Sequence, residues 1–109
     1  MTHDELTQII ESTFEEIRAI RASKGKDYSR GEADTLSNFK RHAEALDLTP
    51  EQVWAVYAGK HWDAIITYCK RGQVESEPIG GRIDDALTYL LILKGLIADR
   101  ERAEAGDAE

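Results

Sequence analysis

The sequence has little cysteine and no long apolar run, and each shortage excludes a class of protein. Its single cysteine, Cys69, cannot form an internal disulfide and offers no zinc cluster, which fits a reducing compartment. The longest apolar stretch, residues 87–93, is far shorter than the ~20 residues that span a bilayer. Residues 1–11 are polar and acidic, unlike a secretory signal. We therefore expect a cytoplasmic protein without a membrane partner.

Basic residues are also in deficit, which limits the partners that the chain can bind. The 21 aspartates and glutamates outnumber the 14 lysines and arginines, so the net charge is -7 and the isoelectric point is near 5.0. This balance argues against a general duplex-DNA binder, because such a protein needs a basic face. A local basic site could still hold one anion. The length of 109 residues predicts one helical domain over residues 1–100, followed by a frayed acidic tail over residues 101–109.

Proline is scarce as well, and one of the two prolines marks the start of a helix. Thr49 and Gln52 have the spacing of a capping box, with Pro50 at the first helical position. Two basic residues and a glycine at positions 70–72 predict the end of that helix. Thr2 and Glu5 form the same capping pattern at the start of an earlier helix, which we expect to end near residues 23–25.

Apolar spacing completes a pattern of four helices, without the alternation that is typical of strands. A shorter second helix presents Leu36, Phe39, Ala43 and Leu46 on one face, and a fourth helix runs from about Arg82 to about residue 100. Short connections between such helices predict an all-α antiparallel bundle. Residues 87–93 are apolar on nearly all sides of the fourth helix, so we expect a second subunit to cover one face. The fold class is therefore an antiparallel bundle of about four helices that forms a homo-oligomer.

A basic segment follows the first helix, and its composition predicts a loop over residues 24–34. Lys24, Lys26 and Arg30 surround Asp27 and Tyr28, which gives three cations within seven residues of an acidic chain. One interpretation is an anion site in which Tyr28 stacks on a base. The other is a solvated loop with Tyr28 folded onto the core, and the sequence does not choose between them.

The third helix carries one polar line on an otherwise apolar surface. Lys60, Asp63 and Thr67 share this line, which is either the solvent side with a modest Lys60–Asp63 ion pair or a phosphate site. In the second interpretation Lys60 binds phosphate, and Asp63 orients it or binds a metal. We interpret His61 as a packed or surface histidine, because no second histidine or cysteine lies at a metal-ligand spacing.

Aspartates near the start of the fourth helix are the most function-like residues in the chain. Asp84 is explained by the helix dipole, which favours acids in a first turn. Asp85 shares a helical line with apolar residues, so we expect it to point inward and to need Lys60, Arg82 or a divalent cation as its partner. Two glutamates one turn apart on the first helix could join it to hold Mg²⁺, although surface glutamates at this spacing are common: Glu11 and Glu15.

Three segments together, KGKDYSRGEADTLSNF, KHWDAI and GRIDDALTYLLIL, resemble the phage nucleotide-modification-associated domain type 1 family. The resemblance implies a phage-type protein in the host cytoplasm that binds a (deoxy)nucleotide. More distantly, the layout is similar to the MazG-like all-α NTP pyrophosphohydrolases, whose ExxE and ExxD pairs bind Mg²⁺ on the substrate. Here the first pair is spaced ExxxE and the second reads RIDD, so the acidic set is incomplete.

Three functions follow from these residues and from the resemblance. The first is binding of a nucleotide with a role in its metabolism or modification, including Mg²⁺-dependent pyrophosphohydrolysis by metal-bound water. The second is a catalytically inactive sponge that sequesters a nucleotide second messenger of host antiphage defence. The third is a structural or interaction module. The expected nucleotide-binding residues are Lys24, Lys26, Asp27, Tyr28, Arg30, Asn38, Lys60, Trp62 and Arg82, and the expected Mg²⁺ ligands are Glu11, Glu15, Asp63, Asp84 and Asp85.

Overall fold

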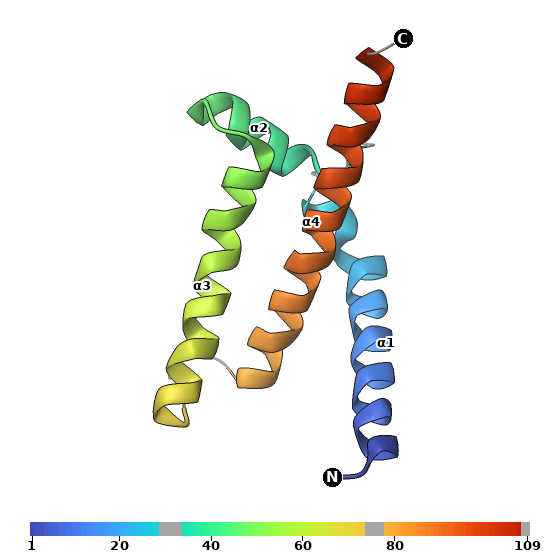
Figure 1. Ribbon diagram of the computed structural model, residues 1–109, viewed down its shortest axis with the longest axis vertical. Coiled ribbons are helices and arrows are strands. Elements are labelled where there is room, and N and C mark those ends of the chain that lie inside the picture. The colour runs from blue at the N-terminus through green and yellow to red at the C-terminus, as the bar shows by residue number, and fades with distance from the viewer. Residues whose placement is uncertain (29–33, 74–77, 108–109) are drawn as a thin grey trace. The chain divides into compact units, whose positions relative to one another are not determined.

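The computed structural model describes residues 1–28, 34–73 and 78–107, which form helices and no strand (Figure 1). The prediction of an all-α chain is confirmed over these ranges. The chain divides into two compact units, Met1–Ser37 and Asn38–Glu109, and each is described by itself. In the described part of the chain, no helix has the length and apolar character that crossing a membrane requires. The helices are α1 (His3–Tyr28), α2 (Ser37–Leu46), α3 (Pro50–Arg71) and α4 (Ile79–Asp107).

The first unit consists mainly of α1, and its start confirms the predicted capping box. The Glu5 backbone N–H donates to the Thr2 hydroxyl oxygen at 3.1 Å, and the Thr2 backbone N–H donates to the Glu5 carboxylate at 3.3 Å. Both bonds satisfy amide donors that have no partner inside the helix.

The end of α1 differs from the prediction, because the helix continues to Tyr28. Residues 24–28 therefore do not belong to the loop that their composition predicts. One glycine inside a helix costs only about 1 kcal/mol relative to alanine, and the residues around Gly25 are acceptable in a helix. A helix that already runs for more than twenty residues can absorb that cost.

The second unit begins with α2 and α3, whose junction follows the sequence signals. Thr49 is the N-cap of α3: its hydroxyl accepts from the Gln52 backbone N–H at 3.1 Å, and its own N–H donates to the Gln52 side chain at 2.9 Å. Gly72 closes the helix with φ at 76°, and its N–H donates to the Tyr68 carbonyl at 2.7 Å. The predicted start and end of this helix are both confirmed.

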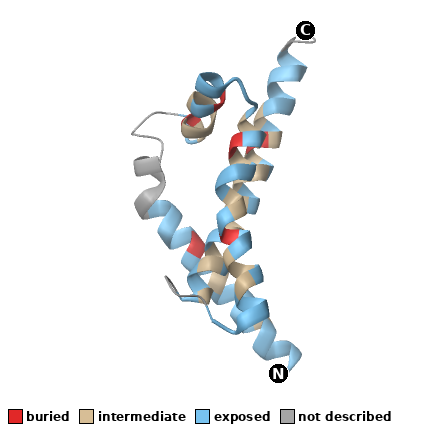
Figure 2. Ribbon diagram, turned by 90° about the vertical axis from the view of Figure 1, so that its left-hand side faces the viewer, coloured by how far each residue is buried: buried red, intermediate tan, exposed pale blue. Residues whose placement is uncertain are grey.

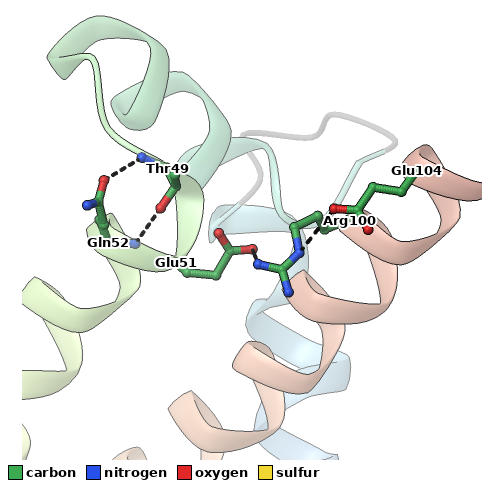
Figure 3. A network of polar contacts seen from close by, with 5 residues as sticks. All are labelled: Thr49, Glu51, Gln52, Arg100 and Glu104. Atoms are coloured by element: carbon green, nitrogen blue, oxygen red, sulfur yellow. Dashed lines mark hydrogen bonds and ion pairs between the residues drawn. The ribbon is translucent and has the colours of Figure 1, made fainter. Parts of the chain in front are cut away.

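Helices α3 and α4 lie side by side and run in opposite directions (Figure 1). An ion pair joins the two helices near the start of α3, where the Arg100 guanidinium of α4 is 3.9 Å from the Glu51 carboxylate (Figure 3). Arg100 is also 3.8 Å from the carboxylate of Glu104 on its own helix. Helix α2 joins the same unit through the Lys40 ammonium, which donates to Asp99 at 2.5 Å. Phe39 packs edge-on against Tyr57 of α3, with ring centroids 6.1 Å apart.

Helix α4 is longer than predicted at both ends. Gly80 and Gly81 lie inside its first turn rather than in the preceding loop. At the other end the helix reaches Asp107, beyond the expected end near Arg100 and through most of the expected frayed tail. Residues 101–105 are mainly glutamate, arginine and alanine, which are good helix formers, and the Arg100–Glu104 pair supports the same turn.

Few side chains are buried in the described structure (Figure 2). Leu46, predicted to face inward, is 63% exposed because it is the last residue of α2. Helix α4 exposes Leu90 and Leu91 at 50% and 45%. The buried apolar residues are Ile17, Ala43, Val53 and Leu96.

Candidate functional site

A polar cluster lies where the first turns of α4 pack against α3. His61 of α3 is buried, and its Nδ1 is 3.3 Å from Nη1 of Arg82 and 3.8 Å from a carboxylate oxygen of Asp85. Arg82 is half-buried, whereas the Asp85 side chain is 52% exposed. We call these three residues the Arg82–His61–Asp85 cluster. In this cluster, the Arg82 guanidinium and the Asp85 carboxylate both lie near the same atom, Nδ1 of the His61 imidazole.

The chemistry of arginine fixes the proton on the His61 ring. A guanidinium carries only donors and keeps its charge, so the Arg82 contact requires Nδ1 of His61 to accept. A neutral His61 then carries its proton on Nε2. The Asp85 oxygen at 3.8 Å is too far for a hydrogen bond and acts on the ring through its charge.

Aromatic side chains support the cluster on the α3–α4 contact. The ring of Tyr89 lies 5.1 Å from the His61 ring, centroid to centroid, at an angle of 37°. Two turns before His61 on α3, the Trp54 indole N–H donates to the Tyr89 backbone carbonyl at 2.6 Å. Partial burial of these rings, with the Trp54 N–H paired, stabilises the contact between α3 and α4. The imidazole of His61 is therefore positioned by packing on both helices.

The backbone beside Arg82 is open. A Cβ atom built on Gly80 or Gly81 would meet nothing within 4 Å, so neither glycine is required by packing. Each glycine weakens the helix by about 1 kcal/mol relative to alanine. The first turn of a helix also presents amide donors that have no partner inside the helix. Because Gly80 and Gly81 have no side chains, the backbone of the first turn of α4 stays accessible beside the Arg82 guanidinium.

The polar line predicted on α3 lies at the surface. Lys60 and Asp63 are exposed, and in the described structure no ion pair joins them, so that predicted pair is wrong. An exposed lysine gains little from a fixed pair and loses side-chain entropy by forming it. Trp62 is 58% exposed and follows directly after His61. Lys60 and Trp62 therefore flank the cluster in sequence and remain accessible to a ligand.

The expectation that Asp85 points inward is wrong. Asp85 shares a helical line with Tyr89, but it lies near the start of α4, where its carboxylate reaches solvent. This position avoids the free-energy cost of burying a charge. Its expected partner Arg82 is near, although the contact of both residues is with His61. Asp84 is half-buried, and its backbone carbonyl accepts from the Thr88 hydroxyl at 3.0 Å.

The remaining predicted site residues lie elsewhere in the chain. Asn38, at the start of α2, accepts from Arg41 of the same helix and takes no part in the cluster. The glutamates of α1 are exposed. Within the described ranges, no three histidine, cysteine, aspartate or glutamate side chains gather closely enough to hold a metal ion. Arg30 and the side chains of Lys24, Lys26, Asp27 and Tyr28 lie outside the described residues.

The burial of His61 confirms the packed alternative of its interpretation, and the sequence holds a signal that favours burial over the surface. His61 follows Trp54 by two helical turns and so lies on the face of α3 that packs on α4. That spacing predicts burial, and burial of an imidazole requires polar partners.

Comparison with protein-family models, with curated proteins and with solved structures finds no match to this chain.

Proposed function

We propose that this protein binds a (deoxy)nucleotide, with the phosphates at the start of α4. The observation that carries the proposal is the Arg82 guanidinium, held half-buried against His61 beside two glycines that packing does not require. Arginine forms paired hydrogen bonds with phosphate oxygens, and the free amides of a helix start add further donors. The proposal includes the antiparallel four-helix bundle and the cytoplasmic setting expected from the sequence.

Residues next to the cluster could complete the ligand contacts. Lys60 is exposed one position before His61, and its long side chain supplies a second cation. Trp62 is 58% exposed and offers a ring face on which any base can stack. Binding by stacking and charge does not select a base, so we expect several nucleotides to bind. The cations of residues 24–30 remain predicted contributors.

Two fates of the bound nucleotide follow from the neighbouring acids. In the first, Asp84 and Asp85 bind Mg²⁺ together with the nucleotide phosphates, since the described carboxylates do not form a metal site by themselves, and water attacks a phosphoanhydride. In the second, the nucleotide is stored intact, as a sponge for a signalling nucleotide of host antiphage defence would require. The RIDD sequence favours storage, because a cation stands where an ExxD motif has a metal ligand. If the protein is a purely structural or interaction module, we expect neither storage nor hydrolysis of a nucleotide.

Isothermal titration calorimetry with deoxynucleoside triphosphates, cyclic dinucleotides and inorganic triphosphate tests the proposal. Arg82→Ala should weaken binding about tenfold to a hundredfold, the effect of losing one or two charged hydrogen bonds. Arg102→Ala is the matched control, since it removes the same charge from an exposed position of α4. Gly81→Ala should raise the melting temperature, because the added methyl group meets nothing in the free protein and alanine favours the helix. The same variant should weaken binding, because the methyl group would occupy the space through which the phosphates approach the helix start.

Recovery of the ligand after heat denaturation separates the two fates. Unaltered nucleotide after incubation with Mg²⁺ supports storage, and release of pyrophosphate supports hydrolysis. If the nucleotide is hydrolysed, Asp85→Asn should abolish the release of pyrophosphate. If the nucleotide is stored, the same variant should still yield unaltered nucleotide. Absence of heat in every titration, or equal loss in Arg82→Ala and Arg102→Ala, would refute nucleotide binding at this cluster.

A further inference from the structure

His61 is buried, yet one of its polar atoms faces the residue that we expect to bind phosphate. The residue is 7% exposed, so its ring offers almost no surface on which a ligand could lie. Its Nδ1 atom is 3.3 Å from Nη1 of Arg82, across the contact between α3 and α4. Packing alone does not account for this contact, because an apolar ring of similar size would fill the same space. Any effect of His61 on a ligand therefore passes through the guanidinium.

The spacing of residues on α4 explains why several groups meet the His61 ring. Arg82, Asp85 and Tyr89 follow one another at i, i+3 and i+7, so they share one face of the helix. The Tyr89 ring lies against the imidazole, with centroids 5.1 Å apart. The Asp85 carboxylate is 3.8 Å from Nδ1, which is farther than the Arg82 nitrogen at 3.3 Å. The ring thus packs on an aromatic side chain while its Nδ1 atom faces a cation.

The protein holds the Arg82 guanidinium by two of its nitrogen atoms. Its Nε atom is buried, and its Nη1 atom faces His61. Because the guanidinium is planar and rigid, a rotation of its plane would move Nη1 away from His61. A free arginine side chain samples many rotamers, and a ligand that binds it must supply the free energy of ordering it. The contact with His61 removes part of that cost before a ligand arrives.

Two properties of the His61 side chain can be separated by substitution. Phenylalanine keeps an aromatic ring against Tyr89 and removes the acceptor. Asparagine removes the ring and keeps an acceptor, because its Oδ1 is as many bonds from the backbone as Nδ1 of histidine. A role in packing alone predicts that phenylalanine is the better replacement. A role through the acceptor predicts that asparagine is the better replacement for ligand binding.

We propose that His61 is a positioning residue of the nucleotide site: its Nδ1 atom accepts from Arg82 and holds the guanidinium in the orientation that binds phosphate, while His61 itself does not touch the ligand. This inference rests on the proposed function, since it needs Arg82 to bind phosphate. It adds that the Nε2–H tautomer of His61 is the form that supports binding. Because His61 acts through Arg82, its contribution to affinity disappears when Arg82 is removed.

Isothermal titration calorimetry with inorganic triphosphate, which has no base to stack on Trp62, is the first test. His61→Phe should weaken binding about tenfold, the effect of losing one hydrogen bond to a charged group. His61→Asn should retain most of the wild-type affinity, although loss of the ring should lower the melting temperature. His42→Phe is the matched control, because it makes the same replacement at an exposed histidine of α2 and should leave the affinity unchanged.

A double variant tests whether His61 acts through Arg82. Arg82→Ala combined with His61→Phe should bind triphosphate no more weakly than Arg82→Ala alone. Additive losses would show that His61 affects binding by another route, which overturns the proposal. Binding that weakens with Arg82→Ala and stays unchanged with His61→Phe overturns the positioning role and leaves the proposed function standing. Absence of triphosphate binding by the wild-type chain overturns both.

Nitrogen-15 NMR of the His61 ring tests the geometry without a ligand. At a slightly alkaline pH, where imidazoles are neutral, an acceptor Nδ1 and a protonated Nε2 give widely separated resonances. His61→Phe assigns these signals among the 3 histidines of the chain. The wild-type chain should show the Nε2–H tautomer, and Arg82→Ala should allow a mixture of both tautomers. A proton on Nδ1 in the wild-type chain would mean that His61 donates to Asp85, and this result would overturn the proposal.

Discussion

The two units of the chain use similar local signals but differ in how their helices are covered. Helices α1 and α3 both begin with a threonine capping box. In the second unit, α3 packs on α4 through Trp54, His61 and their contacts. In the first unit, α1 has the same kind of start and a comparable length, yet its apolar residues are largely exposed. Local signals thus define a helix without defining what covers it.

The difference matters because burial, rather than helix propensity, supplies most of the stability of a helix in a protein. The second unit obtains burial from its own chain. The first unit carries an equally regular apolar pattern, but most of that pattern is exposed in the described structure. The following predictions test this contrast, beginning with the largest effect.

Loss of a buried leucine should separate the two units most clearly. Leu96 is 2% exposed, so Leu96→Ala should lower the free energy of unfolding by about 2–5 kcal/mol at any protein concentration. Leu6 of α1 is 48% exposed, and Leu6→Ala should cost little at low concentration. If a second copy covers α1, the cost of Leu6→Ala grows with concentration. Urea denaturation at two concentrations measures both, and a large cost of Leu6→Ala at every concentration would remove the contrast.

Two glycines of the second unit should respond in opposite directions. Gly72 has φ at 76°, so Gly72→Ala should destabilise the protein by about 1 kcal/mol. Gly59 lies inside α3, and a Cβ there meets nothing within 4 Å, so Gly59→Ala should stabilise by about 1 kcal/mol. Thermal unfolding of both variants checks the signs. Destabilisation by Gly59→Ala would mean that another molecule packs closely against α3 at that position.

The matched capping boxes should give the smallest difference. Thr49→Ala should cost about 1 kcal/mol, because α3 is coupled to α4 and its start cannot open alone. Thr2→Ala removes the same bonds at the chain terminus, where the first turn can fray, and should cost a few tenths of a kcal/mol. Hydrogen exchange of the first-turn amides reads each cap directly. Equal costs would show that the start of α1 is held as firmly as that of α3.

The sequence predicted most of the helical architecture and part of the site. Thr2, Thr49 and Gly72 mark helix ends through their own side chains or backbone conformation, so the sequence is sufficient there. The composition of residues 24–28 and the glycines before Arg82 misled, because a helix supported along its length tolerates residues that are typical of loops. Arg82 was one of three alternatives for the partner of Asp85, and both residues lie beside His61, whereas the prediction that Asp85 points inward was wrong.

By itself, the sequence determined that the described chain is helical, where the caps of α1 and α3 lie, and that residues 87–93 of α4 are apolar on nearly all sides. These properties depend on neighbours a few residues apart, which the sequence displays directly. Only the tertiary structure decided that His61, rather than Lys60 or Asp63, meets Arg82 and Asp85. Helical periodicity leaves the facing side of a helix uncertain by about one residue, or 100°. Packing of α3 against α4 removes that uncertainty, because only one rotation of α3 buries Val53 and His61 together.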